Sequence, residues 1–292
     1  MPSLDARGGI SAAQLVIYIP VLVLSAILVM RHGFRKQAGW IFLVILSLVR
    51  IVGSGAHIAA ELSSDPSLGL IETFSILDNV GLSPLMMCTI GFLSTVGIGA
   101  FDNNKRVTVG LRLLGLLASV AMILTIVGAI NIGEAKNQSD VNSAELYRHI
   151  GGILYGALFA LVTLAHFFFW SHKDSIMMHR RTLLAGISAV LPLLFIRTAY
   201  SILSDFSPSA VPGTTAPTNA LSKFSSTTGT WWIYLAMSVA CEVLVVIIYL
   251  VVGMSVPVSQ EYDSVPDDRN DYALHNTYDT GYNPGYAKPY GQ

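Results

Sequence analysis

Seven apolar stretches, each long enough to cross a membrane, constrain the fold of this chain more than any other feature. They cover residues 10–30, 38–60, 72–100, 107–130, 147–170, 181–203 and 229–254. A helix needs about 20 apolar residues to span the hydrocarbon core of a bilayer, whereas the strands of a membrane barrel alternate in shorter segments. The pattern therefore predicts an all-α, polytopic membrane protein, a bundle of seven transmembrane helices. The third stretch is long, so we expect it to tilt or to begin outside the bilayer.

The composition agrees with a chain that lies in lipid. Only 12% of the residues are charged and 53% are hydrophobic, whereas a soluble domain has about 25% charged residues. The net charge of −1 provides no basic field that would attract nucleic acid. We therefore expect membrane lipid as a partner, and no nucleic acid.

The distribution of basic residues predicts the orientation of the chain. Arg and Lys gather in segments 31–37, 102–106 and 171–181, whereas segment 61–72 has none and carries acidic residues. Loops rich in Arg and Lys stay on the cytosolic side of a membrane. We therefore expect the N-terminus outside and the C-terminus in the cytosol, in a multi-pass protein of the plasma membrane or an endomembrane.

Two segments expected on the outer side have the composition of glycosylation sites. Asn137-Gln138-Ser139 is a sequon for N-glycosylation. Segment 207–230 is rich in Ser, Thr, Pro and Ala, as O-glycosylated loops are. Both features predict a glycoprotein that carries an N-linked glycan on Asn137.

The end of the chain differs from the rest. Residues 255–292 include many acidic residues and six tyrosines but few aliphatic side chains, a composition that does not support a packed core. We therefore divide the chain into a seven-helix domain, 1–254, and a disordered cytosolic tail, 255–292. Asn283-Pro284-Gly285-Tyr286 matches the NPxY form that adaptor domains bind, although a tail so rich in Tyr, Asn and Pro also produces this motif by chance.

Ionisable residues inside the spans are candidate functional residues, because an unpaired charge in lipid is costly. Arg50 lies midway along the second stretch and Glu242 midway along the seventh. At about 1.5 Å per residue, Arg50 is about 18 Å from the inner end of its helix and Glu242 about 18 Å from the outer end of its own. Their depths agree within about one turn in a core about 30 Å thick. We expect them to pair or to share a water-filled cavity.

Two further charged residues lie in the outer third of their spans. Arg197 and Asp78 form a second candidate pair, or they join Arg50 and Glu242 in one intramembrane polar network. Buried pairs of this kind often only fix the order of the helices. The alternative is that the charges form a ligand or substrate site.

Three residues near the outer face form a candidate outer cluster: His57, Glu61 and His149. A bis-histidine haem site needs histidines that face each other across the bundle, and a zinc hydrolase needs three ligands at one depth. Of the histidines, only His57 and His166 lie clearly inside spans, and they lie at opposite ends. We therefore expect no metal and no cofactor.

Small residues predict two close contacts between helices. Gly152 and Gly156 form a GxxxG pattern in the fifth stretch, and Gly55 and Ala59 have the same spacing in the second. Both patterns let neighbouring helices approach closely. We expect packing within the chain rather than dimerisation.

Four segments carry a resemblance to known proteins. They are LVIYIPVLVLSAILVMRHGFRKQAGWIFLVILSLVRIVG at 15–53, LDNVGLSPL at 77–85, PLLFIRTAYSIL at 192–203 and the span at 231–253. Together they resemble a family of fungal seven-span membrane proteins that has no assigned activity, and the resemblance covers nearly all of residues 10–254. It implies a fungal origin and a seven-helix fold. In its layout the family is similar to fungal receptor-like and lipid-exporter-like proteins, and it assigns no catalytic residue to this chain.

Three functions remain open. The first is a receptor-like or lipid-responsive protein that binds a small apolar ligand between helices; the odd number of spans, the outer N-terminus and the cytosolic tail favour it. However, the only cysteines, Cys88 and Cys241, both lie in apolar stretches, so the disulfide usual in receptors cannot form.

The second is a membrane-embedded biosynthetic enzyme, similar to a fungal terpene cyclase, that uses an intramembrane carboxylate such as Glu242, Asp78 or Glu61 as an acid. Arginine partners would oppose that role, and whether the chain is an enzyme stays open.

The third is a transporter of lipid or another small molecule. The buried charges favour it, but no duplicated halves are visible in the sequence.

Overall fold

The computed structural model describes residues 4–32, 38–63, 68–101, 104–211, 214 and 218–255. The α-helices of this part of the chain are α1 (Ala6–His32), α2 (Ala38–Leu62), α3 (Leu68–Val80), α4 (Leu82–Gly97), α5 (Lys105–Gly133), α6 (Gln138–Ser171), α7 (Met178–Asp205), α8 (Trp231–Tyr234) and α9 (Cys241–Ser255). Short 3₁₀ turns lie at Lys173–Ser175 and Ser222–Phe224, and a π-helical segment, Leu235–Ala240, joins α8 to α9. The prediction of an all-α fold is confirmed.

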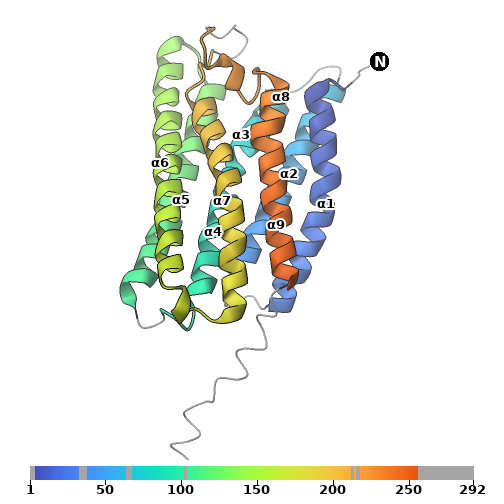
Figure 1. Ribbon diagram of the computed structural model, residues 1–292. Helices are drawn as coiled ribbons and strands as arrows, with labels where there is room; N and C mark the ends of the chain where they lie inside the picture. Colours follow the sequence, from blue (N-terminus) through green and yellow to red (C-terminus); the bar gives the residue numbers. More distant parts are fainter. Residues whose placement is uncertain are drawn as a thin grey trace, which may run out of the picture. The chain divides into compact units, whose positions relative to one another are not determined.

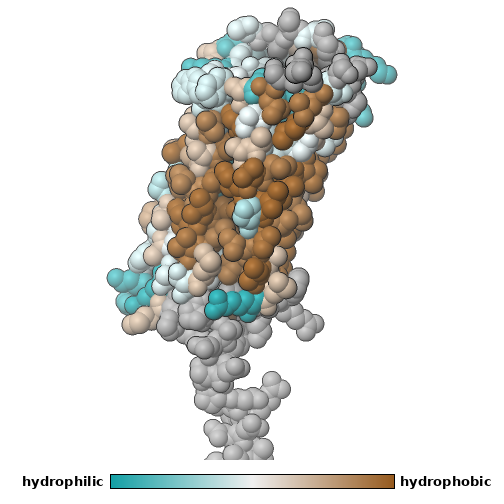
Figure 2. All heavy atoms as spheres, turned by 90° about the vertical axis from the view of Figure 1, so that its right-hand side faces the viewer, coloured by the Kyte–Doolittle hydropathy of each residue, from teal (hydrophilic) through white to brown (hydrophobic). Residues whose placement is uncertain are grey.

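Seven helical segments of the described chain are long and apolar enough to cross a membrane. α3 and α4 together make the third of them, and α8, the π-helical segment and α9 make the seventh. Large apolar side chains cover their outward faces; Met30, Leu113 and Leu164, for example, are each more than half exposed. Figure 2 shows an apolar band across the middle of one face, with polar residues gathered toward both ends. Soluble monomers rarely expose such a surface, so the fold is that of an integral multi-pass membrane protein.

The boundaries of the spans follow the predicted ones closely, except in α6. This helix begins at Gln138, nine residues before the predicted start at 147, and it has 34 residues. A helix of that length is about 50 Å long, about 20 Å more than the hydrocarbon core. Its polar first turns therefore extend beyond the apolar stretch, and the side chain of Asn137 caps them by accepting the amide hydrogen of Asp140 at 2.9 Å.

Helix α4 is the central helix of the bundle. It contacts α2, α5, α6 and α7, and nearly all of its residues are buried. Around it, α1 packs on α2, α5 on α6, α6 on α7, α7 on α9 and α9 on α1 (Figure 1). Leu85, Met86 and Leu93 of α4 share one fully buried core with Leu43 and Leu46 of α2. The ring of helices around α4 brings residues far apart in sequence to one site.

The third span is interrupted by a short turn, a feature that the expectation of a tilt or of a start outside the bilayer did not include. α3 ends at Val80, α4 begins at Leu82, and Gly81 lies in the turn between them. Pro84, in the first turn of α4, has no amide hydrogen, and its ring conflicts with the carbonyl four residues earlier. That carbonyl belongs to Val80, so the helix is interrupted at this point.

Only one of the two small-residue patterns makes the close contact between helices that was predicted for both. A Cβ atom added at Gly152 would lie 3.0 Å from Asp205 Oδ2 on α7, and one at Gly156 would lie 3.1 Å from Ile202. The predicted close packing of this GxxxG pattern within the chain is therefore confirmed. A Cβ atom added at Gly55 would meet nothing within 4 Å, so the prediction of a close contact there is wrong.

The tail from residue 256 onward, including the NPxY motif at Asn283–Tyr286, lies outside the described residues. Its disorder and its adaptor binding stay predictions.

Candidate functional site

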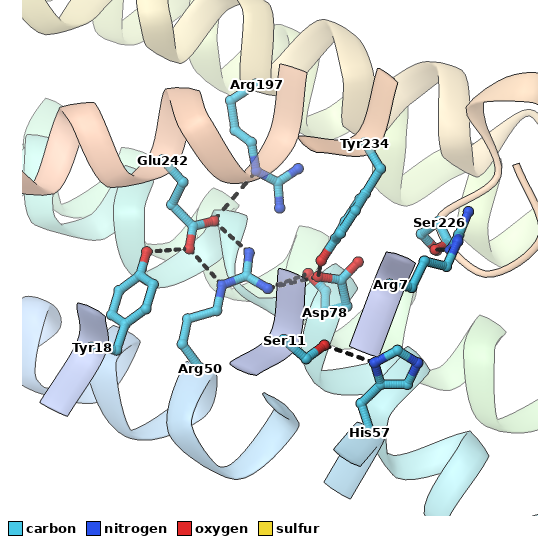
Figure 3. Close-up of polar contacts among 10 residues, drawn as sticks. All are labelled: Arg7, Ser11, Tyr18, Arg50, His57, Asp78, Arg197, Ser226, Tyr234 and Glu242. Carbon is cyan, nitrogen blue, oxygen red and sulfur yellow. Dashed lines mark hydrogen bonds and ion pairs between the residues drawn. The ribbon is translucent and has the colours of Figure 1, made fainter. Parts of the chain in front are cut away.

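Arg50 is the centre of a buried ionic network. Its guanidinium contacts both carboxylate oxygens of Glu242 on α9, with Nε donating to Oε1 at 2.5 Å and Nη2 donating to Oε2. On its other side, Nη1 donates to Asp78 Oδ1 on α3 at 2.7 Å. Figure 3 shows Arg50 lying between the two carboxylates. The expected contact of Arg50 with Glu242 is present, in the two-point geometry that suits guanidinium and carboxylate groups.

Arg197 joins the network through Glu242. Its Nε lies 3.4 Å from Glu242 Oε2. The second expected pair, Arg197 with Asp78, is therefore not formed, because α3 packs on α2 and Asp78 binds Arg50 instead. The four charged residues instead make a single network of two cations and two anions, which is the other arrangement expected from the sequence. Such a balance is what keeps charges stable in a dry interior.

Two tyrosines that the sequence analysis missed complete the network. The hydroxyl of Tyr18 on α1 donates to Glu242 Oε1 at 2.7 Å, and the hydroxyl of Tyr234 on α8 donates to Asp78 Oδ1 at 2.7 Å. Both side chains are buried. A signal was available in the sequence, because a tyrosine hydroxyl buried in a span needs a hydrogen-bond partner. The network thus joins side chains from five of the seven spans.

The turn at Gly81 leaves room for the guanidinium of Arg50. A Cβ atom added at Gly81 would lie 2.5 Å from Arg50 Nη2 and 2.8 Å from its Cζ. A larger residue would therefore displace the group that the two carboxylates hold.

The π-helical segment brings Tyr234 and Glu242 to one face of the seventh span. The two residues are eight positions apart, so an unbroken α-helix would place them about 80° apart around its axis. A π turn accommodates one additional residue, which reduces the difference to about 20°. One face of this span can therefore reach Asp78 and Arg50 together.

A narrow cleft leads from one end of the bundle to Arg50 and Asp78. Its walls come from α1, α2, α3, α8 and the loop before α8, and they include the polar side chains of Ser11, Gln14 and Ser54. Its volume is about 20 Å³, which is space for one or two water molecules. The cleft is therefore polar and, in this state, nearly closed.

Arg7 holds the loop at the mouth of the cleft. Its guanidinium donates to the backbone carbonyls of Ser226 and Gly229, the latter at 2.5 Å. Figure 3 shows Arg7 and Ser226 beside Tyr234, on the mouth side of the network. The start of α1 and the loop before α8 thus form one lip of the cleft.

Gln14 presents a donor without an acceptor. Its side chain is 3% exposed, and no group of the described chain accepts a hydrogen bond from its Nε2. A buried donor left unpaired costs about 1–3 kcal/mol. Its position on the wall of the cleft therefore points to a polar partner inside the cleft.

The bundle is apolar on the other side of the network. Leu43, Leu46 and Leu85 are fully buried there, and the hydroxyls of Thr89 and Tyr249 bind each other at 2.7 Å. In the described residues the cleft therefore has an opening at one end only.

A comparison with known protein families shows which family the chain belongs to. The model of one family, described as a domain of unknown function (DUF7702), matches residues 4–259. The chain belongs to the DUF7702 family. The match covers all seven spans and every residue of the ionic network. No curated protein and no solved structure matches the chain.

The predicted outer cluster of this DUF7702 protein is assembled in part. His57 Nε2 lies 3.3 Å from Glu61 Oε1, one turn along α2, and His57 Nδ1 lies 2.7 Å from the hydroxyl oxygen of Ser11. His149 instead stacks on Phe206, with ring centroids 4.3 Å apart, on the side of the bundle formed by α6 and α7. The structure thus brings His57 and Glu61 together beside the cleft but not His149.

Glu61 also holds the residues at the start of α1. It accepts the amide hydrogen of Asp5 at 3.3 Å. The amide hydrogen of Gly8 donates to the carboxylate of Asp5 and thereby lowers the pKa of Asp5. The first turn of α1 is thus attached to the end of α2 at the mouth of the cleft.

A second buried ion pair, between α6 and α7, was missed by the sequence analysis. Arg148 Nε lies 3.7 Å from Asp205 Oδ1, and the remaining nitrogens of Arg148 donate to the carbonyl of Ser204 and the hydroxyl of Ser209. Asp205 lies beyond the predicted end of its span at 203, and Arg148 is the second residue of the predicted stretch 147–170. The GxxxG pattern at Gly152 was the available signal in the sequence, because Gly152 is where α6 lies against Asp205 of α7.

Within the described residues, no three His, Cys, Asp or Glu side chains are grouped so that they could hold a metal ion.

Proposed function

We propose that this protein is a receptor-like membrane protein that binds a small polar ligand in the cleft above Arg50. The observation that carries the proposal is a cleft with one opening that ends on an ionic network joining five spans. A ligand that contacts Arg50 or Asp78 competes with their partners in the network. Binding would therefore change how the helices pack against one another.

The lining of the cleft supports a ligand with hydrogen-bonding groups. On sequence grounds alone we expected an apolar ligand between the helices, whereas the amide of Gln14, the hydroxyl of Ser54 and the ring of His57 all face this space. The cleft of about 20 Å³ is too small for an organic molecule. A ligand would have to select a state in which the helices stand further apart, and that shift in population is the response of the receptor.

Two features favour a receptor over the alternatives. Among the residues that the structure describes, the core on the far side of Arg50 is apolar and has no polar path to the other end, which a transporter would need in some state. Both carboxylates of the network, Asp78 and Glu242, are bound by arginine. An ionised carboxylate held in this way is a poor proton donor, which argues against a cyclase-like acid at this position.

The predicted orientation places the mouth of the cleft on the non-cytosolic side. The mouth lies at the start of α1 and the end of α2, whereas Arg31, Lys105 and Lys173 lie at the other end of the bundle. Because basic loops stay in the cytosol, a ligand would enter from outside the cell or from the lumen of an organelle. Asn137, at the start of α6, would then be accessible for glycosylation.

The test is mass spectrometry of small molecules retained by the full-length protein after purification in detergent. Wild type should retain a polar compound. Gln14→Met removes the amide but keeps the volume, and it should lose the compound while unfolding at an equal or higher temperature, because an unpaired donor is gone. Val16→Met, on the lipid-facing side of α1, should retain it. Recovery of acyl lipids alone, or equal retention by Gln14→Met, would contradict the proposal.

A further inference from the structure

A second hollow lies on the lipid-facing wall of the bundle, on the opposite half from the cleft. It is a groove of about 840 Å³ between α4 and the first half of α5, with Phe42 of α2 and Phe101 at its edges. Its α5 wall runs from Val107 to Ser119. Gly115 lies on that wall, and a Cβ atom added there would meet nothing within 4 Å. The groove is thus open space that no side chain of the described chain fills.

Arg112 is the one charged residue among those lining this groove. It is exposed, and no hydrogen bond or ion pair joins its side chain to another residue of the described chain. Side chains of a helix lean toward its N-terminus, so Arg112 leans toward the end of α5 that carries Lys105 and Arg106. A long basic side chain in a span extends in this way toward the headgroups.

We propose that this groove binds one acyl chain of an anionic phospholipid, whose phosphate pairs with Arg112. The charge of the groove is complementary to that lipid, since its walls are apolar and its single charged group is a cation that can bind a phosphate at two points. The predicted orientation also places this end of the bundle in the cytosolic leaflet, where anionic lipids are concentrated.

The length of the groove fits one leaflet. From Val107 to Ser119 the helix rises about 18 Å, slightly more than half of a hydrocarbon core about 30 Å thick. An acyl chain that starts at the headgroup level can therefore lie along the whole α5 wall. Thr108, at the headgroup end of that wall, is placed to contact the glycerol or headgroup.

Native mass spectrometry of the full-length protein in detergent tests this site directly. The protein is titrated with phosphatidylserine or with phosphatidylcholine of identical acyl chains. Wild type should bind one phosphatidylserine more tightly than phosphatidylcholine. Arg112→Gln should weaken phosphatidylserine binding about fivefold, the contribution of one basic residue near a membrane surface. It should weaken phosphatidylcholine binding less, because the choline cation balances the charge of that lipid's phosphate. Gly115→Leu fills the groove and should weaken both.

Matched variants separate the groove from general charge and from folding. Lys105→Gln removes a cation from the same end of α5 but not from the groove, and Gly110→Leu adds the same side chain on the face of α5 toward α6. Both should bind lipid as wild type does. Equal affinity of wild type for the two lipids, an equal loss in Lys105→Gln and Arg112→Gln, or wild-type binding by Gly115→Leu would each overturn the proposal.

Discussion

A guanidinium buried between two carboxylates is stable in lipid only while the charges balance. Arg50 and Arg197 are matched by Asp78 and Glu242, and all four are buried. Removing one partner leaves an uncompensated buried charge, which is costlier than losing the whole group of charges. The network therefore behaves as one unit in which each residue depends on the others.

Glu242→Gln should reduce the free energy of unfolding by about 3–5 kcal/mol, because Arg50 and Arg197 then share one carboxylate. Thermal unfolding of the detergent-purified protein measures the loss. The double variant Arg197→Gln/Glu242→Gln restores the balance of charge and should recover part of it. If the single variant unfolds at the wild-type temperature, the network does not hold the bundle together.

Gly81→Ala tests the room that Arg50 needs. The added Cβ would lie 2.5 Å from Arg50 Nη2, so we expect a loss of about 1–3 kcal/mol from overpacking. Gly55→Ala is the matched control, since its Cβ would meet nothing within 4 Å; it should be neutral or gain about 0.5–1 kcal/mol from helix propensity. Thermal unfolding distinguishes the two, and equal effects would contradict the geometry.

At the level of single residues, the sequence revealed the charges but not all of their partners. Arg50 and Glu242 could be matched because depth in the membrane follows from the position along a helix. Asp78 was matched either with Arg197 or with the whole network, because depth does not show which helices are neighbours. Tyr18 and Tyr234 carry no charge, so the search for ionisable groups passed over them.

The seventh span shows how a local change in helix geometry positions functional groups. The π-helical segment at Leu235–Ala240 rotates Tyr234 into line with Glu242. Sequence periodicity could not predict it, because every residue of the segment suits an α-helix in lipid. The break at Gly81 was easier to predict, since Pro84 three residues later disfavours a continuous helix.

Inserting one alanine after Ala236 adds a residue that the π-helical segment does not absorb, and it should turn Tyr234 away from Glu242 by about 100°. Asp78 would lose its hydroxyl donor, and the thermal stability of the purified protein should fall. Ala236→Val changes the same lipid-facing position without shifting the register, so it should unfold as wild type does. An insertion variant as stable as wild type would show that the register of this span is unimportant.

For the whole molecule, the sequence predicted the architecture well, because a helix in lipid must be long and apolar. Six of the seven spans begin and end near the predicted positions, and α6 is longer only in polar turns beyond the apolar stretch. The arrangement around α4 could not be predicted, since packing in a membrane depends on shape rather than on hydrophobicity. The function follows from that arrangement, because the cleft exists only between helices distant in sequence.

The measurement that tests the account most directly is the reaction of introduced cysteines with a small, membrane-impermeant thiol reagent. Ser54→Cys lies in the cleft, and Ser47→Cys lies seven residues earlier on the same face of α2, beyond Arg50. The native Cys88 and Cys241, both buried, are replaced by alanine, and the reagent is applied to sealed vesicles from each side. We expect Ser54→Cys to react from the non-cytosolic side alone, through the state in which the helices stand further apart, and Ser47→Cys to react from neither side. Reaction of Ser47→Cys from either side, or of Ser54→Cys from the cytosolic side, would contradict a receptor-like cleft with a single outer opening.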